Sequence, residues 1–251
     1  MLLFYISHGD PIYDPDDLTP LGHRQAESVA RRLALFGVDE VYSSTSTRAM
    51  QTAQPTCELL HKELITLDFL NENYLDKVLQ LPVPGKKSVW VWSHPVYGPL
   101  LARRDVRELG DRWYEHPELK DFHFERALHP IYQSLDEFIA SYGYEHDTEL
   151  GLYRVRERQY EKRIAIFAHE SIGKIFMSHL LDIPYPYYAA HFEMKHTGVT
   201  AIRFDDGASA PGDTVPREYA RARVLTLSND SHLFRDGLPL THTSGRIRDK
   251  Y

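Results

Sequence analysis

Two short apolar segments in opposite halves of the chain are each followed directly by polar residues that include a histidine. Residues 2–6 (Leu-Leu-Phe-Tyr-Ile) lead into Ser7 and His8, and residues 164–168 (Ile-Ala-Ile-Phe-Ala) lead into His169. Both segments are β-branched or aromatic and lack helical periodicity, which is typical of strands buried on both faces of a parallel sheet. Ligand sites of open α/β sheets form beyond the carboxyl ends of such strands, so His8 and His169 are predicted to face one site.

The rest of the chain predicts a doubly wound α/β domain. Thr19 and Pro20 supply an N-cap and a first-turn proline for a helix that should end near Gly37. The apolar spacing predicts helices at about 20–36, 46–61, 127–142 and 150–159, a helix capped by Ser171, and strands at 39–43, 64–67, 197–203 and 221–227. We therefore expect a three-layer α/β/α fold around a mostly parallel sheet.

Residues 73–160 interrupt the alternation of strands and helices. The first part of this segment carries several prolines and all three tryptophans of the chain, with no clean periodicity. We interpret it as a helical and irregular cap insertion over the carboxyl edge of the sheet. The predicted organisation is thus a single α/β domain over residues 1–251 with a cap at about 73–160.

The composition argues against a nucleic-acid-binding, membrane-spanning or disulfide-rich protein. The formal net charge of −7 argues against a nucleic-acid surface, and no apolar run is long enough to span a membrane. A single cysteine, Cys57, excludes an internal disulfide framework and fits a reducing compartment. Because Met1 leads directly into the first strand, we expect no signal peptide and a cytoplasmic protein. The sequence leaves a homo-oligomer open.

A candidate anion site follows the second predicted strand. Residues 41–44 read as the end of a strand, and Ser46 and Arg48 lie at the start of the next helix. Hydroxyl groups, backbone N–H groups and an arginine at a helix N-terminus bind anions well. Together with His8 and His169, this segment indicates phosphoryl-transfer chemistry with an imidazole nucleophile.

Four motifs occur in order along the chain. They are Ser-His-Gly at 7–9, Leu-Thr-Pro-Leu-Gly at 18–22, Ser-Thr-Ser-Thr-Arg-Ala-Met-Gln-Thr-Ala at 44–53 and Phe-Ala-His-Glu at 167–170. This order resembles the histidine phosphatase superfamily, the phosphoglycerate-mutase-like enzymes, with serine in place of the arginine of their Arg-His-Gly motif. The resemblance covers about 1–72 and 160–235, including a closing segment at 228–233.

The resemblance implies a role for each matching residue. His8 is expected to attack phosphorus and form a phosphohistidine, with a backbone carbonyl fixing its tautomer. His169 is expected to bind the phosphoryl oxygens together with Arg48, the backbone of Gly9, and Ser7. A structural role at a strand end is the alternative for each histidine.

The proton donor for the leaving oxygen has two candidates. Glu72 lies in Leu-Asn-Glu, which resembles the Leu-x-Glu of the family, and burial beside the site is expected to raise its pKa. Glu170 directly follows the second histidine, the position of the acid in the acid-phosphatase branch, and otherwise joins the phosphate-binding set. We favour Glu72 and leave Glu170 open.

We therefore expect a metal-independent phosphatase that hydrolyses a small phosphomonoester. None of the other histidines has a compact zinc-ligand spacing, so no metal or other cofactor is expected. Ser7 removes a charge-assisted contact to the phosphoryl group, which weakens the activity expected on generic substrates unless Arg246, Arg248 or a basic cap residue replaces it. A non-catalytic phospholigand-binding protein and a phosphoglycerate-mutase-type phosphotransferase are the alternatives.

Overall fold

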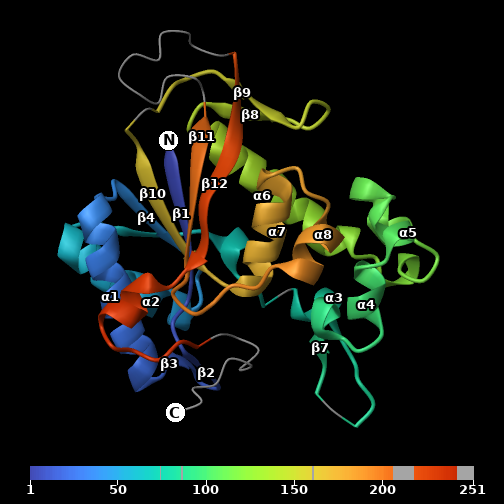
Figure 1. Cartoon of the computed structure of the whole chain (residues 1–251), viewed down its shortest axis with the longest axis horizontal. Coiled ribbons are helices and arrows are strands. Elements are labelled where there is room, and N and C mark those ends of the chain that lie inside the picture. Colours follow the sequence, from blue (N-terminus) through green and yellow to red (C-terminus); the bar gives the residue numbers. More distant parts are fainter. Residues whose placement is uncertain (74, 86, 160, 206–217, 242–251) are drawn as a thin grey trace.

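A computed structural model describes residues 1–73, 75–85, 87–159, 161–205 and 218–241. Its centre is an eight-stranded sheet with the strand order β5-β4-β10-β1-β11-β12-β9-β8 (Figure 1). The strands of this sheet are β1 (Leu2–Ser7), β4 (Glu40–Ser43), β5 (Leu64–Thr66), β8 (Tyr144–Asp147), β9 (Leu152–Val155), β10 (Arg163–Ala168), β11 (Val199–Asp205) and β12 (Tyr219–Asn229).

The two histidine-bearing strands are neighbours and end at the same level. β1 pairs in parallel with β10, and Ser7 lies opposite Ala168 at the ends of the two strands. The His8 amide then donates to the Ala168 carbonyl at 2.9 Å, so the two strands stay paired up to their histidines. β4 and β5 continue the parallel half of the sheet, whereas β11 runs antiparallel to β1.

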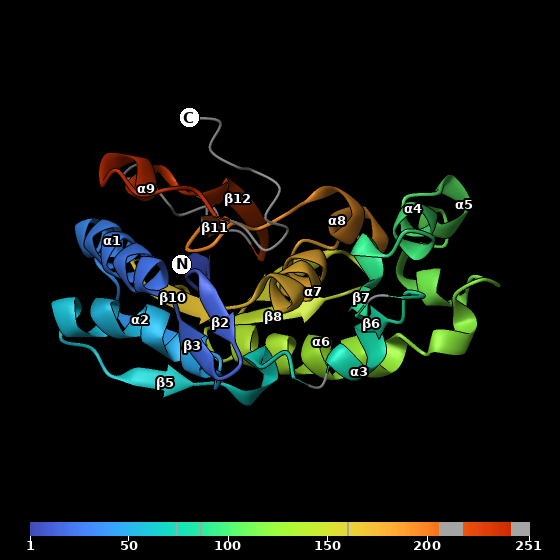
Figure 2. The ribbon, with the colours of Figure 1, turned by 90° about the horizontal axis from the view of Figure 1, so that it is seen from below.

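Helices cover both faces of the sheet (Figures 1 and 2). α1 and α2 cover one face of the sheet, and α6 and α7 cover the other. Phe4, Ile6 and Phe167 belong to one hydrophobic cluster, and Tyr5, Ile164 and Ile166 belong to the other. The long helices are α1 (Pro20–Phe36), α2 (Thr47–Leu60), α6 (Glu125–Ala140) and α7 (Glu170–Leu180), with α8 (Tyr185–His191) and α9 (Ser231–Arg235) shorter. The predicted three-layer α/β/α fold is confirmed.

The ends of α1 follow the sequence signals. The Thr19 side chain accepts a hydrogen bond from the Gly22 amide, Pro20 occupies the first turn, and Gly37 closes the helix at a φ of 71°. The expected start of α7 is wrong, because the helix begins at Glu170 and His169 occupies the N-cap position. The second histidine therefore lies directly at a helix N-terminus.

The helix predicted at 150–159 is also wrong. β8 and β9 form an antiparallel hairpin there, and β9 pairs with β12, so the end of the predicted cap extends the main sheet. Tyr153 is 2% exposed while its neighbour Arg154 faces outward, which is the two-residue alternation of a strand. Gly151, at a φ of 64°, makes the turn that a helix could not accommodate.

The segment between β5 and α6 consists of short elements, of which η1 and α3 contact α6, and α4, α5 and η3 contact α8 (Figure 1). They are η1 (Asp68–Leu70), α3 (Asp76–Leu79), β6 (Gln80–Leu81), β7 (Val89–Trp90), η2 (Val91–Ser93), α4 (Tyr97–Leu101), α5 (Arg104–Arg107), η3 (Gly110–Glu115) and η4 (Lys120–Phe122). Their apolar residues, Trp113 and Phe124 among them, join the same core as α6 and α7. A second unexpected element is the hairpin of β2 (Pro11–Tyr13) and β3 (Asp16–Leu18) directly after His8.

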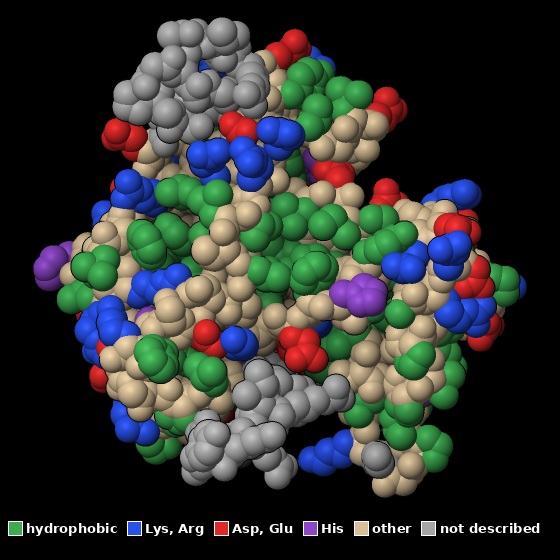
Figure 3. Space-filling model, in the orientation of Figure 1, with side chains coloured by type: hydrophobic (Ala, Val, Ile, Leu, Met, Phe, Trp, Pro, Cys, Tyr) green, Lys and Arg blue, Asp and Glu red, His purple; other side chains and the backbone are tan. Residues whose placement is uncertain are grey.

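Figure 3 shows hydrophobic side chains near the middle of one face, along β12, where Val224, Leu225 and Leu227 are exposed. A homo-oligomer stays a prediction. None of the described helices is both long enough and apolar enough to cross a membrane.

Candidate active site

A cavity of about 420 Å³ lies at the carboxyl ends of β1 and β10. It brings together residues that the sequence singled out, His8, Arg48, Glu72 and Glu170, with residues that it did not. The complete lining among the described residues is His8, Tyr13, Arg48, Glu72, Asn73, Asp76, Gln80, Trp90, Trp92, Glu170 and Ser171. His169 lies directly behind this lining, with its ring centroid 5.3 Å from that of His8.

His8 is held in the state that a nucleophile needs. Its Nδ1 lies 2.7 Å from the Gly9 carbonyl oxygen, which can only accept a hydrogen bond. Nδ1 therefore carries the proton, and the lone pair is on Nε2, as the sequence analysis expected. Burial, followed by the neighbouring His169, His196 and Arg48, holds the pKa of His8 well below its usual range. The ring is neutral at pH 7.

His169 is a buried donor and acceptor at the N-terminus of α7. Its Nε2 lies 2.9 Å from Ser44 Oγ, and its Nδ1 accepts from Arg48 Nη2 at 3.1 Å, because a guanidinium can only donate. Burial and then the charge of Arg48 hold the pKa of His169 well below its usual range. The anion-binding segment at the start of α2 thus contacts the second histidine directly.

Arg48 is clamped by two carboxylates. Its Nη1 donates to Asp16 Oδ1 at 2.6 Å, and its Nη2 donates to Glu72 Oε1 at 2.5 Å. Asp16 also accepts the Thr47 amide, so the β2–β3 hairpin is tied to the start of α2. Sequence reasoning missed Asp16, although the polar turn around Asp14-Pro15 was a signal that a hairpin follows His8.

Gly9 does not present its amide to the cavity, contrary to expectation. The Gly9 N–H donates to Thr52 Oγ1 at 2.9 Å. A Cβ at position 9 would come within 2.7 Å of the Gly22 carbonyl oxygen, so a side chain there would collide with the backbone of α1. This glycine is required for packing of the backbone against α1, and its carbonyl fixes the tautomer of His8.

Ser7 is buried at the end of β1 and is absent from the lining of the cavity. Its Oγ has no hydrogen-bond partner among the described residues. Arg246 and Arg248, the candidates for a replacement cation, lie outside the described part of the chain. Arg48 is the only lysine or arginine among the described residues that line the cavity.

A third histidine, His196, lies beside His8 with the ring centroids 5.4 Å apart. Its Nδ1 lies 2.8 Å from Thr241 Oγ1 and 3.6 Å from Asp10 Oδ1. Sequence reasoning missed this residue. The available signal was its position just before β11, because the start of a strand antiparallel to β1 must lie near the end of β1.

The two candidate acids have different partners. Glu72 contacts Arg48, lies 3.4 Å from His169 Nδ1, and accepts a hydrogen bond from Ser171 Oγ. Glu170 pairs with the buried Lys174 at 3.1 Å and accepts the Met194 amide at 3.4 Å. Both carboxylates line the cavity. Of the two, Glu72 contacts His169 and Arg48, which are expected to bind phosphate.

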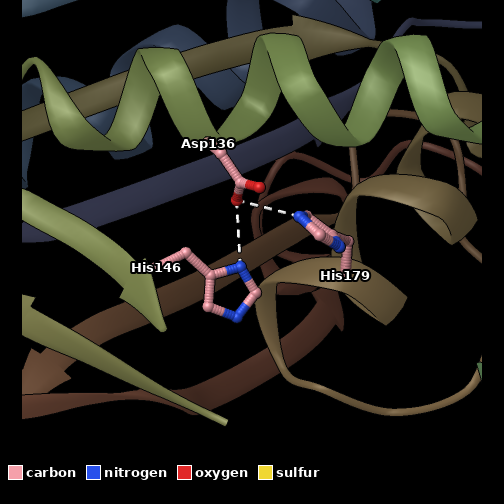
Figure 4. A group of neighbouring side chains, drawn as sticks. All are labelled: Asp136, His146 and His179. Carbon is pink, nitrogen blue, oxygen red and sulfur yellow. Dashed lines mark hydrogen bonds and ion pairs between the residues drawn. The ribbon is translucent and has the colours of Figure 1, made fainter. Parts of the chain in front are cut away.

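A second cluster of titratable groups joins α6, β8 and α7 away from this cavity (Figure 4). One oxygen of Asp136 accepts from His146 Nδ1 at 2.9 Å and from His179 Nε2 at 2.8 Å. These donor atoms lie within 4.8 Å of one another, and nitrogen and oxygen ligands of this kind hold divalent transition metals. The structure already pairs them by hydrogen bonds, and the absence of a metal stays a prediction.

The same cluster predicts a pH-dependent stability. Burial would lower the pKa of His146, but hydrogen bonds to Asp136 and Asp182 outweigh it and raise this pKa to about 9 from 6.5. A raised pKa contributes stability that is complete below pH 6.5 and is lost as pH rises through 9. At about 1 kcal/mol for such a bond, Tm should fall by roughly 2–4 °C across this range.

Thermal melts of the wild type and His146→Gln between these pH values check this expectation. The variant should lose the extra decline, whereas replacement of the exposed His23 by Gln should keep it. An equal decline in all three proteins would contradict the role of His146.

Residues 12–84, which include Arg48 and Glu72, match the model of the histidine phosphatase superfamily (branch 1). This part of the chain is similar to that superfamily. A protein of Hydrogenobacter thermophilus provisionally named phosphoserine phosphatase 2 is 33% identical over 119 residues, which is 45% of this chain and 59% of that protein. The chain thus spans less than two thirds of the length of this relative.

Two solved structures have a fold similar to that of this chain. A phosphoserine phosphatase from Entamoeba histolytica, in complex with 3-phosphoglyceric acid, has a TM-score of 0.56 at 17% identity and covers 92% of this chain and 98% of its own. A mycobacterial glucosyl-3-phosphoglycerate phosphatase in complex with VO3 has a TM-score of 0.56 at 16% identity, covering 91% and 98%. At these identities, the likeness establishes the fold.

Proposed function

We propose that this chain is a phosphatase that hydrolyses a small phosphomonoester through a phosphohistidine on His8. The observation that carries the proposal is the neutral imidazole of His8, whose Nδ1 is bonded to the Gly9 carbonyl while the residue lines a cavity shared with Arg48. A neutral ring with its lone pair on Nε2 can attack phosphorus without first losing a proton. The three similar proteins described above are named phosphatases, which agrees with hydrolysis.

In the proposed reaction, the lone pair of His8 Nε2 forms the bond to phosphorus and the bond from phosphorus to the ester oxygen breaks. Arg48 stabilises the negative charge on the phosphoryl oxygens, and His169 positions Arg48 by accepting a hydrogen bond from its Nη2. Glu72, once it has taken up a proton in the complex with the ester, gives that proton to the leaving alcohol. Glu72 then takes a proton from water as that water attacks phosphorus, which releases phosphate and restores His8.

Incubation with nitrophenyl phosphate in the presence of a chelator tests the proposal. We expect steady turnover that chelation leaves unchanged, because every proposed step uses side chains of this chain alone. Turnover that stops with the chelator and returns with a divalent metal would contradict the mechanism.

A non-catalytic phospholigand-binding protein is the second candidate, and one observation favours it. Arg48 is already paired with Asp16 and Glu72, and no other lysine or arginine lines the described part of the cavity. Binding of phosphate esters without turnover would support this candidate. The same shortage of cations disfavours a mutase, which must hold an acidic sugar phosphate while it retains the phosphoryl group.

Restoring an arginine at position 7 should raise activity. Strand alternation places Ser7 on the same face as Tyr5, whose ring packs 5.2 Å from Phe176 of α7. An arginine extending along this face would run toward the start of α7, where Glu170 lines the cavity. We expect kcat/KM for nitrophenyl phosphate to rise at least tenfold, about 1.4 kcal/mol, in Ser7→Arg.

Ser7→Gln is the matched control, because it adds a long polar side chain without charge and should bring no gain. An unchanged or lower rate in a folded Ser7→Arg would mean that the site works without a cation at this position.

A further inference from the structure

Among the cavity-lining residues without a part in the proposed reaction are one carboxylate, Asp76, and two tryptophans, Trp90 and Trp92. Asp76 is the first residue of α3, and the two half-buried tryptophans belong to β7 and η2. The indole rings stack on each other with centroids 4.9 Å apart and an angle of 9° between their planes. This part of the cavity therefore combines a carboxylate with a double aromatic layer.

In and around the cavity, carboxylates outnumber basic side chains. Arg48 is offset by Asp16 and Glu72, and the carboxylate of Glu170 is paired with Lys174. Asp76 accepts a hydrogen bond from Gln80 Nε2 at 2.7 Å, but no basic side chain of the described chain lies within ion-pair distance of it. Burial and then the charge of Glu72 raise the pKa of Asp76, so a cation nearby would stabilise both carboxylates.

The aromatic layer suits a cation as well. Lys174 Nζ lies 5.4 Å from the ring centroid of Trp92, so this indole already holds a cation of the chain, and Trp90, stacked on it, is the indole left to meet a ligand. Indole faces attract ammonium groups, and an aromatic surface next to a carboxylate is a common arrangement for recognising them. An anionic substrate group would instead meet the negative faces of the rings and the charge of Asp76.

We propose that the cavity selects phosphomonoesters whose alcohol part carries a positive charge, with the ammonium group held by Asp76 and the Trp90–Trp92 pair. This inference rests on the proposed phosphatase function and names its substrate class. The positive charge of an ammonium group reduces the net negative charge of the ester. A second cation at the position of Ser7 is then needed less. The volume of about 420 Å³ is large enough for a small amino-alcohol phosphate.

Two esters of nearly the same shape test the proposal. Phosphocholine and 3,3-dimethylbutyl phosphate differ in having a charged nitrogen or a neutral carbon at the same position. Each is measured as a competitive inhibitor of nitrophenyl phosphate hydrolysis at constant ionic strength, so that the different leaving groups do not enter the comparison. We expect the inhibition constant of phosphocholine to be at least tenfold lower.

Substitutions of Asp76 and Trp90 test whether these residues cause the preference for phosphocholine. Asp76→Asn and Trp90→Leu should each reduce the ratio of the two inhibition constants to about threefold or less. Asp121→Asn, an exposed carboxylate outside this cavity, should leave the ratio unchanged. These ratios compare two ligands on one protein, so a general loss of activity does not affect them.

The outcomes separate this inference from the proposed function. Equal inhibition constants in a wild-type protein that turns over nitrophenyl phosphate would overturn the substrate class and leave the phosphatase in place. A preference that survives both Asp76→Asn and Trp90→Leu would also overturn it. A folded wild-type protein with no turnover at all would remove the proposed function, and this inference with it.

Discussion

Replacement of His8 by alanine should lower kcat for nitrophenyl phosphate by about a thousandfold or more, because it removes the atom that attacks phosphorus. The His8 amide, and not its side chain, continues the pairing of β1 with β10. The fold should therefore survive the substitution. Steady-state kinetics on the purified variant, with circular dichroism to verify folding, gives the measurement.

Trapping the intermediate makes the test specific. A rapid acid-free quench of the wild type with a labelled aryl phosphate should yield a phosphorylated protein whose label is lost in acid, as a phosphoramidate bond requires. His8→Ala should give no such species, whereas the exposed His23→Ala should behave as the wild type. A His8→Ala protein that keeps more than a tenth of the activity would exclude His8 as the nucleophile.

Replacement of Glu72 by glutamine should separate good from poor leaving groups. Alkyl phosphates need a proton on the departing oxygen, so their turnover should fall by about 10²- to 10⁴-fold, whereas nitrophenyl phosphate should slow far less. The glutamine can accept from Arg48 through its oxygen and donate to Ser171 Oγ through its amide, which preserves the contacts of Glu72. The loss would therefore reflect the missing proton.

Glu170→Gln is the matched variant, since it carries the same change on another carboxylate of the cavity. Its contacts with Lys174 and the Met194 amide lie away from His169 and Arg48, so we expect similar losses, both small, for the two substrate types. If Glu170→Gln shows the leaving-group dependence and Glu72→Gln does not, Glu170 is the acid.

The elements that the sequence predicted correctly are those specified by neighbouring residues. The apolar runs before His8 and His169 form β1 and β10, and Thr19 and Gly37 bound α1. The spacing of apolar residues, the capping residues of a helix and the length of a strand are local properties, so they can be recognised in a short stretch of sequence. The prediction at 150–159 failed because pairing with β12, far along the chain, decided the conformation of β9.

Some features of the candidate site could likewise be predicted from neighbouring residues, whereas others depend on tertiary packing. The positions of His8 and His169 follow from two strand ends in one parallel sheet, and Arg48 follows from its place at a helix start. The choice of nitrogen on His8 also follows locally, since Gly9 is its neighbour. By contrast, the donation of the Gly9 amide to Thr52 was decided by how closely α2 approaches β1.

The sequence by itself determined which chemistry we propose, because the residue types and their places at strand and helix ends indicate a candidate nucleophile and candidate phosphate-binding partners. Only the tertiary structure decided which other charged and titratable residues lie around the candidate site. Asp16, His196 and Asp76 reach the site from a hairpin, the start of β11 and the α3 segment. The sequence can indicate these elements, but it does not show which of their side chains lie at the site. Their charges act over a few ångströms of space regardless of separation along the chain, so packing alone establishes which of them meet.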